Sequence, residues 1–436
     1  MSDNTSIDEA EREMEDLYIL QCVLSGVSRG PRWDHNRMDW DEHVRKLMHE
    51  GKFEREYRMS LGACEHLIHM LAPALQRVQW NSRGIAPICV EHIVALGLRA
   101  LGGGRIQDIR HIVGASLSAS YKAFDDFVNA VNTCPDLDIN FPQSAAEWKL
   151  VNAEFSAKSS DGIMQGCVGA IDGYFQRIQT PFKKEVGNVQ SYYSGHYESH
   201  GVNCQACVSS DLAFMYFGVV SPGSTNDNVS YPLADGLRDT VEQLPPGLYC
   251  VADAAYTLHE NLLIPFTGIE RNDPAQDAFN FYMSQLRIRV EMAFGRLTNK
   301  FRILKGCMIG SLDRISAIVM ACARLHNFII GFDGVREESV ADDRDDDRSD
   351  DDTTTTTTTF VDDHVAPLGM AYLPVVPNDD WEEIEGMSYT RAAIVDFLRE
   401  NEIRRPLYNL ERKRNEMMVT SPNSELEWES EYISPS

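Results

Sequence analysis

Three carboxylates in this 436-residue chain have the residue types and order that metal-dependent chemistry on phosphate esters requires: Asp172, Asp253 and Glu291. Two-metal cleavage of a phosphodiester needs hard oxygen ligands that hold two Mg²⁺ ions about 3.5–4 Å apart. One ion activates the attacking oxygen and the other stabilises the leaving oxygen. Such ligands must converge from different elements, so the fold has to bring the three residues together.

Two of the carboxylates follow short apolar runs. Residues 167–171 and 248–252 have the length and composition of buried strands, so Asp172 and Asp253 are predicted to end strands and project at the rim of a sheet. Further strands are expected at residues 202–209 and 214–220, and a fifth at 262–264.

The third carboxylate, Glu291, falls inside a helix predicted over residues 277–300. Glu291 lies at the edge of the apolar face, and Arg287 precedes it by one turn, where it can pair with Glu291 or with a phosphate. The apolar stripe that packs this helix on the sheet comprises Leu286, Val290, Ala293, Phe294 and Leu297. A strand-rich region with a crossover helix and this long helix predicts an α/β sheet covered by helices.

Each carboxylate also fits a plainer role when taken singly. Asp172 and Asp253 could cap turns, and Glu291 and Arg287 could form a surface ion pair. Asp227, ahead of a helical stretch at 229–243, is either an accessory metal ligand or the N-cap of that helix. Only the order of the three residues favours a shared site.

A helical region precedes the strands. Residues 87–101, 106–113 and 119–131 are predicted helices, with glycines in the connections, and this outline is that of a helix-turn-helix. Ser116 or Ser118 could cap the last helix. The outline leaves DNA contact and simple packing as alternatives.

Composition limits the other classes of function. The formal net charge of −26 argues against binding nucleic acid by bulk charge, although an acidic and Thr-rich run at 336–363 carries much of the excess. No window approaches about 18 consecutive apolar residues, so no membrane association is expected. Ten cysteines without dense spacing predict no structural disulfides.

Several smaller clusters have two interpretations. Cys204 and Cys207 are predicted to be buried thiols on opposite faces of a strand, while His196 and His200 are expected to face solvent or DNA. The basic residues are candidate DNA contacts or parts of a solvated face, and comprise Lys183, Lys184, Arg287, Arg296, Lys300 and Arg302.

Six blocks in order resemble those of PIF/Harbinger transposases, which are DDE superfamily endonucleases. The blocks are Ala170-Ile171-Asp172-Gly173, Asn203-Cys204-Gln205-Ala206, Pro222-Gly223-Ser224-Thr225-Asn226-Asp227, Asp253-Ala254-Ala255-Tyr256, Arg287 to Leu297, and Leu325-His326-Asn327. The helical region from Phe53 to Val78 also resembles the family's N-terminal module. The sequence departs from the family at Tyr174-Phe175, Ala254-Ala255 and Thr298.

The resemblance implies an RNase H-like (retroviral integrase-type) catalytic core that cuts DNA at transposon ends, with Asp172, Asp253 and Glu291 as ligands of Mg²⁺ or Mn²⁺ and Asp227 as an accessory ligand. It also implies a homo-oligomer that acts on DNA, helped by a Myb-like accessory protein, in the nucleus and the cytoplasm. Arg404-Arg405 and Arg412-Lys413-Arg414 resemble a bipartite nuclear signal. A catalytically silent DNA- or protein-binding factor derived from such a transposase is the alternative.

The domain organisation follows from these patterns. We expect an N-terminal helical segment, a helical domain with a helix-turn-helix, the endonuclease domain, an acidic linker and a tail with a short helix, at residues 1–57, 58–150, 160–330, 334–364 and 365–436.

Overall fold

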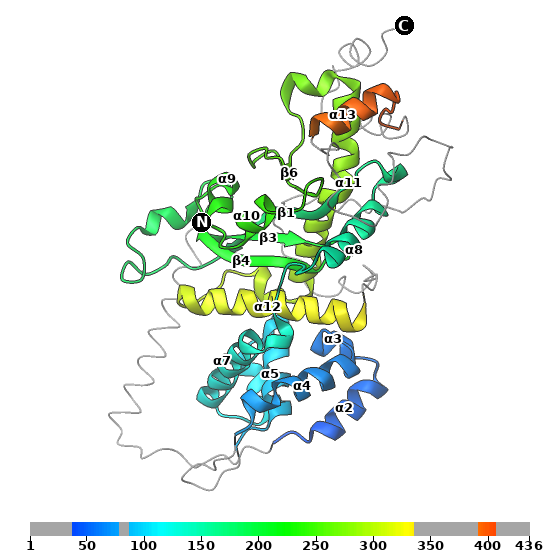
Figure 1. The fold of residues 1–436 in the computed structure, drawn as a ribbon. Coiled ribbons are helices and arrows are strands. Elements are labelled where there is room, and N and C mark those ends of the chain that lie inside the picture. Colours follow the sequence, from blue (N-terminus) through cyan, green and yellow to red (C-terminus); the bar gives the residue numbers. More distant parts are fainter. Residues whose placement is uncertain (1–36, 78–86, 335–390, 407–436) are drawn as a thin grey trace, which may run out of the picture.

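A long helix, α12 (Leu312–Asp333), lies between a group of helices and a mixed β-sheet in the computed structural model of the chain (Figure 1). The structure describes residues 37–77, 87–334 and 391–406. By length and composition α12 could cross a membrane, but more than half of its apolar window is buried inside the protein. It is therefore a core helix shared by the parts on either side of it.

Six strands in the described part of the chain form one mixed sheet, which confirms the predicted α/β class. The order is β2–β3–β1–β5–β6, and β4 also pairs with β3. β1 is antiparallel to β3 and parallel to β5. The strands are β1 (Cys167–Arg177), β2 (Tyr193–Ser194), β3 (Ser199–Val208), β4 (Phe214–Pro222), β5 (Tyr249–Val251) and β6 (Leu262–Leu263).

The first strand is longer than predicted. β1 continues past Asp172 to Arg177, because β3 pairs with it from Ala170 opposite Val208 to Arg177 opposite Gly201. The prediction that Asp172 ends a strand is therefore wrong. Asp172 lies in mid-strand, and its position at the edge of the sheet arises from the shorter neighbour β5.

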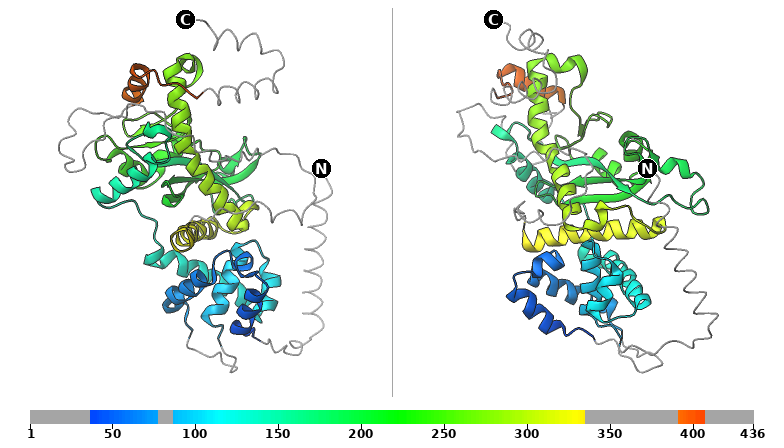
Figure 2. Two further views of the ribbon diagram at one scale, coloured as in Figure 1. Left: turned by 90° about the vertical axis from the view of Figure 1, so that its right-hand side faces the viewer. Right: turned by 180° about the vertical axis from the view of Figure 1, so that it is seen from behind.

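The helices α11 (Pro274–Lys300) and α8 (Ala145–Ser156) pack on strands of the sheet. α11 contacts β1, β3 and β5. Four of its five predicted stripe residues are fully buried, namely Leu286, Val290, Ala293 and Leu297, and the fifth, Phe294, is partly buried. α8, which the sequence pattern did not indicate, packs on β1. Figure 2 shows α11 running from α13 at one end toward α12 at the other.

The stretch predicted as one helix over residues 229–243 is interrupted. α9 (Asp227–Ser230) passes into a single 3₁₀ turn, and α10 (Leu237–Glu242) begins after Gly236, whose φ of 80° lies in the left-handed region. Pro232 in the 3₁₀ turn cannot donate a backbone hydrogen bond, which disfavours a continuous helix here.

A short C-terminal helix, α13 (Arg391–Glu400), packs on α11 (Figure 2). Ile394, Val395 and Leu398 of α13 are buried. Arg405, in one half of the proposed nuclear signal, pairs with Asp277 of α11 at 3.2 Å. The other half, residues 412–414, lies outside the described residues, as do the acidic run and residues 1–36.

The helices below α12 form one packed group. They are α2 (Trp40–His49), α3 (Phe53–Tyr57), α4 (Leu61–Leu75), α5 (Val90–Leu101), α6 (Ile106–Val113) and α7 (Leu117–Thr133). Ser116 caps α7 by accepting from the Ala119 N–H, as one of the two predicted alternatives. A Cβ at Gly97 would collide with the Phe127 ring, so this glycine lets α5 and α7 approach closely.

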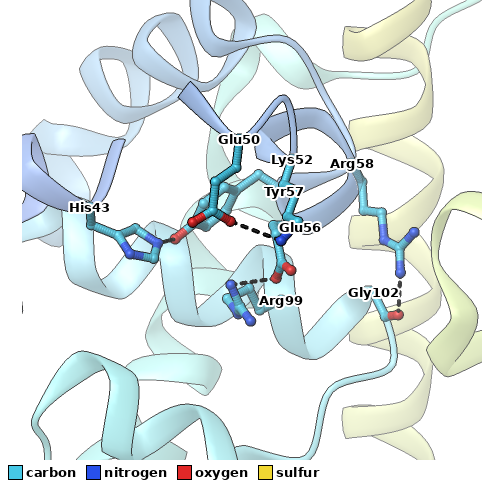
Figure 3. A network of polar contacts seen from close by, with 8 residues as sticks. All are labelled: His43, Glu50, Lys52, Glu56, Tyr57, Arg58, Arg99 and Gly102. Carbon is cyan, nitrogen blue, oxygen red and sulfur yellow. Dashed lines mark hydrogen bonds and ion pairs between the residues drawn. The ribbon is translucent and has the colours of Figure 1, made fainter. Parts of the chain in front are cut away.

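Polar contacts within this group engage several of its basic residues, as Figure 3 shows. Arg99 pairs with Glu56 at 2.6 Å and lies over the buried Tyr57 ring, whose hydroxyl bonds to His43. Arg58 donates to the Gly102 carbonyl. These contacts join α2, α3 and α5.

Two side chains of α12 fasten it to the turn between β3 and β4. His326 is buried and donates through Nε2 to the Leu212 carbonyl at 2.9 Å, and Asn327 bonds to both the N–H and the C=O of Phe214. Burial lowers the pKa of His326 to about 4, so the ring is neutral at neutral pH. The block Leu325-His326-Asn327 thus has a structural role.

Candidate functional site

Strand register brings Asp172 and Asp253 together. Ala170 of β1 pairs with Val251 of the parallel strand β5. Asp172 and Asp253 each follow their paired residue by two positions, so they come level where β5 ends. Each carboxylate accepts a local backbone hydrogen bond, Asp172 from Gly173 and Asp253 from Ala255, both at 2.8 Å.

The environment of Asp172 is unfavourable for its negative charge. Burial, with added repulsion from Asp253 and Asp227, raises the pKa of Asp172 to about 7, against the opposing effects of the Gly173 N–H and Arg287. Three aspartates therefore lie within electrostatic reach of one another, and a bound cation would relieve their repulsion.

Asp227 packs against Gly173, the residue that follows Asp172. A Cβ at Gly173 would collide with Asp227 Oδ1, so the glycine makes room for this carboxylate. The N-cap of α9 is Asn226, whose side chain accepts from the Val229 N–H at 3.1 Å, and the interpretation of Asp227 as that cap is wrong. Because Asn226 takes the cap, the Asp227 side chain is free to turn toward the sheet.

A chain of buried polar groups fixes Asp227. Its Oδ1 accepts from Asn203 at 3.0 Å and from Gln205 at 2.9 Å. Gln205 in turn accepts from the hydroxyl of Tyr256, three residues after Asp253, at 2.7 Å. The sequence analysis did not assign these three residues to the site. The available signal was two amides at alternate positions of an otherwise apolar strand.

Glu291 reaches the aspartates through Arg287. Arg287 Nη1 lies 2.5 Å from Glu291 Oε1 and 3.8 Å from Asp172 Oδ2, so these two oxygens can be no farther apart than the sum, 6.3 Å. Two ions about 4 Å apart, each with ligands at about 2 Å, can join oxygens across that separation. As placed in the structure, no three His, Cys, Asp or Glu side chains of the described residues are close enough together to hold a metal ion.

The other predicted basic residues lie elsewhere. Lys183 and Lys184 are exposed in the loop that follows β1. Arg296 and Lys300 lie near His326, whose pKa their charges help to lower, and Arg302 contacts Gly103 of the helical group. Of the six predicted DNA contacts, Arg287 is placed by the structure against Asp172 and Glu291.

The cysteine and histidine pairs also have defined surroundings. Cys204 and Cys207 are fully buried and belong to two different apolar clusters on opposite faces of β3, as predicted. The nine described cysteines are free. His196 is exposed in the turn before β3, and His200 contacts Thr180.

Comparison with known families assigns the region that holds these carboxylates. Residues 171–327 match the model of the DDE superfamily endonucleases. The matched range contains Asp172, Asp227, Asp253 and Glu291, and it ends at Asn327 of α12. The match indicates a transposase-like nuclease function for this part of the chain. No curated protein and no solved structure matches the chain.

The DDE superfamily generally uses divalent metals, and the donor set fits such an ion. All four candidate ligands are carboxylates, which are hard oxygen donors suited to Mg²⁺ and Mn²⁺. Burial raises the pKa of Asp172, and the charges of Asp253 and Asp227 add to this, so a cation bound beside these carboxylates would favour the ionised form of Asp172.

Removal of one hydroxyl tests the polar chain behind Asp227. Tyr256→Phe leaves the buried Gln205 oxygen without its donor, so we expect a loss of about 1–2 kcal/mol in the free energy of unfolding and about 10–100-fold weaker Mn²⁺ binding. Urea denaturation and calorimetric titration with MnCl₂ measure the two effects. Tyr231→Phe, which alters a ring that contacts Tyr256, is the control. Equal Mn²⁺ affinity in the two variants would contradict a supporting role for Tyr256.

Proposed function

We propose that this protein is a metal-dependent DNA endonuclease and transposase of the PIF/Harbinger kind, with an RNase H-like core. Asp172, Asp253 and Glu291 hold the metal ions, with Asp227 as an accessory ligand. The observation that carries the proposal is the register of β1 and β5, which sets Asp172 level with Asp253 beneath the α11 residues Arg287 and Glu291.

The chain's own residues contribute charge and position to this reaction. Bound divalent cations supply an activated water and neutralise charge on the leaving oxygen. Asp172 is held in a partly buried strand, where electrostatic interactions are stronger than in water. Gln205 and Asn203 orient Asp227 by donating to its Oδ1. Strand transfer uses the same centre, with a DNA 3′-OH in place of water.

DNA engagement is the second element of the proposal. We infer that α5, α6 and α7 act as the helix-turn-helix and that Lys183, Lys184, Arg296, Lys300 and Arg302 contact phosphates. Because the chain is acidic overall, with a net charge of −26, a Myb-like accessory protein would help it to reach transposon ends. Action as a homo-oligomer in the nucleus belongs to the same proposal.

A nicking assay tests this function. Purified protein, terminal-repeat DNA and Mg²⁺ or Mn²⁺ are expected to give nicked product, and Glu291→Gln is expected to reduce it to background. Glu242→Gln is a matched control, because Glu242 forms the same kind of i,i+4 pair with Arg238 on α10. Insertion products would add strand transfer, and cuts without insertion would limit the protein to hydrolysis.

One observation favours the alternative of a catalytically silent factor. Glu291 is paired with Arg287, and the residues that follow Asp253 are Ala254 and Ala255, where the family usually has Ser-Gly. A silent factor would bind terminal-repeat DNA with equal affinity in the presence and absence of metal and would give no nicks.

A further inference from the structure

Arg287 joins two elements of the carboxylate site. Its guanidinium lies 2.5 Å from Glu291 on its own helix and 3.8 Å from Asp172 on β1. The Arg287 and Asp172 side chains are 27% and 19% exposed, so both are largely shielded from solvent. The Glu291 side chain is 47% exposed and can reorient.

The contact with Asp172 distinguishes this arginine from an ordinary helical ion pair. An i,i+4 pair needs only its own helix, as Arg238 and Glu242 show on α10. Arg287 also lies against a carboxylate that two other aspartates repel, and its charge lowers the pKa of Asp172 while theirs raise it. The guanidinium therefore supplies positive charge beside Asp172, where the three aspartates repel one another.

The same position conflicts with metal binding. Glu291 Oε1 lies 2.5 Å from Arg287 Nη1, so the guanidinium occupies one side of that oxygen. Arg287 cannot lose its proton to make way, because guanidinium stays charged in proteins. An ion that approaches Glu291 Oε1 therefore competes with the Arg287 guanidinium for that oxygen.

We propose that Arg287 is a displaceable counter-ion, which holds Glu291 and Asp172 together in the metal-free protein and leaves Glu291 when a divalent cation binds. This inference rests on the proposed function, since it assumes that the carboxylates bind metal. Arg287 is thus a positioning residue that lowers metal affinity and stabilises the empty site.

Calorimetric titration with MnCl₂ and thermal melting of the metal-free protein test the proposal. Arg287→Met keeps much of the apolar stem and removes the charge, so we expect Mn²⁺ to bind on the order of tenfold more tightly. The metal-free melting temperature should fall in the same variant. Arg287→Lys, which keeps the charge, should bind Mn²⁺ within about twofold of the unaltered protein. Arg238→Met is the matched control and should leave Mn²⁺ affinity unchanged.

The outcomes separate this proposal from the proposed function. Tighter Mn²⁺ binding together with a lower metal-free melting temperature supports the counter-ion. Unchanged or weaker binding in Arg287→Met, with binding intact in the unaltered protein, overturns the counter-ion and leaves the nuclease proposal standing. Absence of Mn²⁺ binding in every protein overturns both. If Arg287→Met fails to fold by circular dichroism, Arg287→Gln replaces it, and the same criteria apply.

Discussion

Asp172→Asn is expected to melt at a higher temperature than the unaltered protein at pH 8 without metal, and to lose metal-dependent nicking altogether. Asparagine keeps the oxygen that accepts from the Gly173 N–H and removes the charge. The gain should be several degrees, because 1 kcal/mol corresponds to about 2–4 °C in a domain of this size. Nicking should fall well over a hundredfold, since loss of a residue that merely supports a ligand costs about 10–100-fold.

The pH dependence follows from the raised pKa of Asp172, about 7, which burial causes in the main. Protonated Asp172 is favoured in the folded state, so its stabilising contribution is complete below the carboxyl's ordinary pKa and is lost as pH rises toward 7. The advantage of Asp172→Asn should therefore be larger at pH 8 than at pH 5. Saturating Mn²⁺ should reverse it, because only the unaltered protein gains the binding energy.

Differential scanning calorimetry at both pH values, with and without MnCl₂, measures these differences. Asp239→Asn is the control, since Asp239 is exposed on α10. A lower melting temperature for Asp172→Asn at pH 8 would show that the Asp172 charge is already compensated in the metal-free protein.

Truncation after Gly334 should lower the melting temperature of the metal-free protein by about 10 °C or more. Ile394, Val395 and Leu398 of α13 are 2%, 4% and 0% exposed, and each such side chain contributes about 1.5–3 kcal/mol when fully buried. Truncation also removes the Arg405–Asp277 ion pair and the Arg391 guanidinium, which lies 4.0 Å from the centre of the Phe266 ring.

An internal deletion of residues 341–359 is the control for this truncation. It removes the acidic and threonine-rich run, which contributes little apolar surface, and keeps α13. We expect its melting temperature to match that of the full chain. If the truncated protein melts together with the full chain, α13 does not stabilise α11 in solution.

The features that could be predicted from the sequence are those that depend on local patterns of residues. The apolar stripe of α11 and the bounds of α6 follow from helical periodicity, and residue type narrows the cap of α7 to Ser116 or Ser118, of which the structure has Ser116. The strand before Asp253 is predicted by its composition. Each of these features depends on residues within a few positions of one another.

The remaining features depend on contacts between distant segments. β1 extends to Arg177 only because β3 pairs with it, and Gln205 meets Tyr256 across 51 positions. Asp227 and Asn226 are equally good caps by residue type, so only the packing against Gly173 decides between them. The docking of α13 on α11 has no local signal before the chain folds.

Because the group of helices and the sheet both pack on α12, the two parts of the chain are not independent modules. On one side Arg314 pairs with Asp125 and the Ala317 carbonyl accepts from Asn132, both in α7, while on the other His326 and Asn327 hold the sheet. A helical cassette cut from the chain before α8 would lose the helix that closes its core. Chimeras that exchange the group of helices must therefore carry the α7-facing residues of α12 with them.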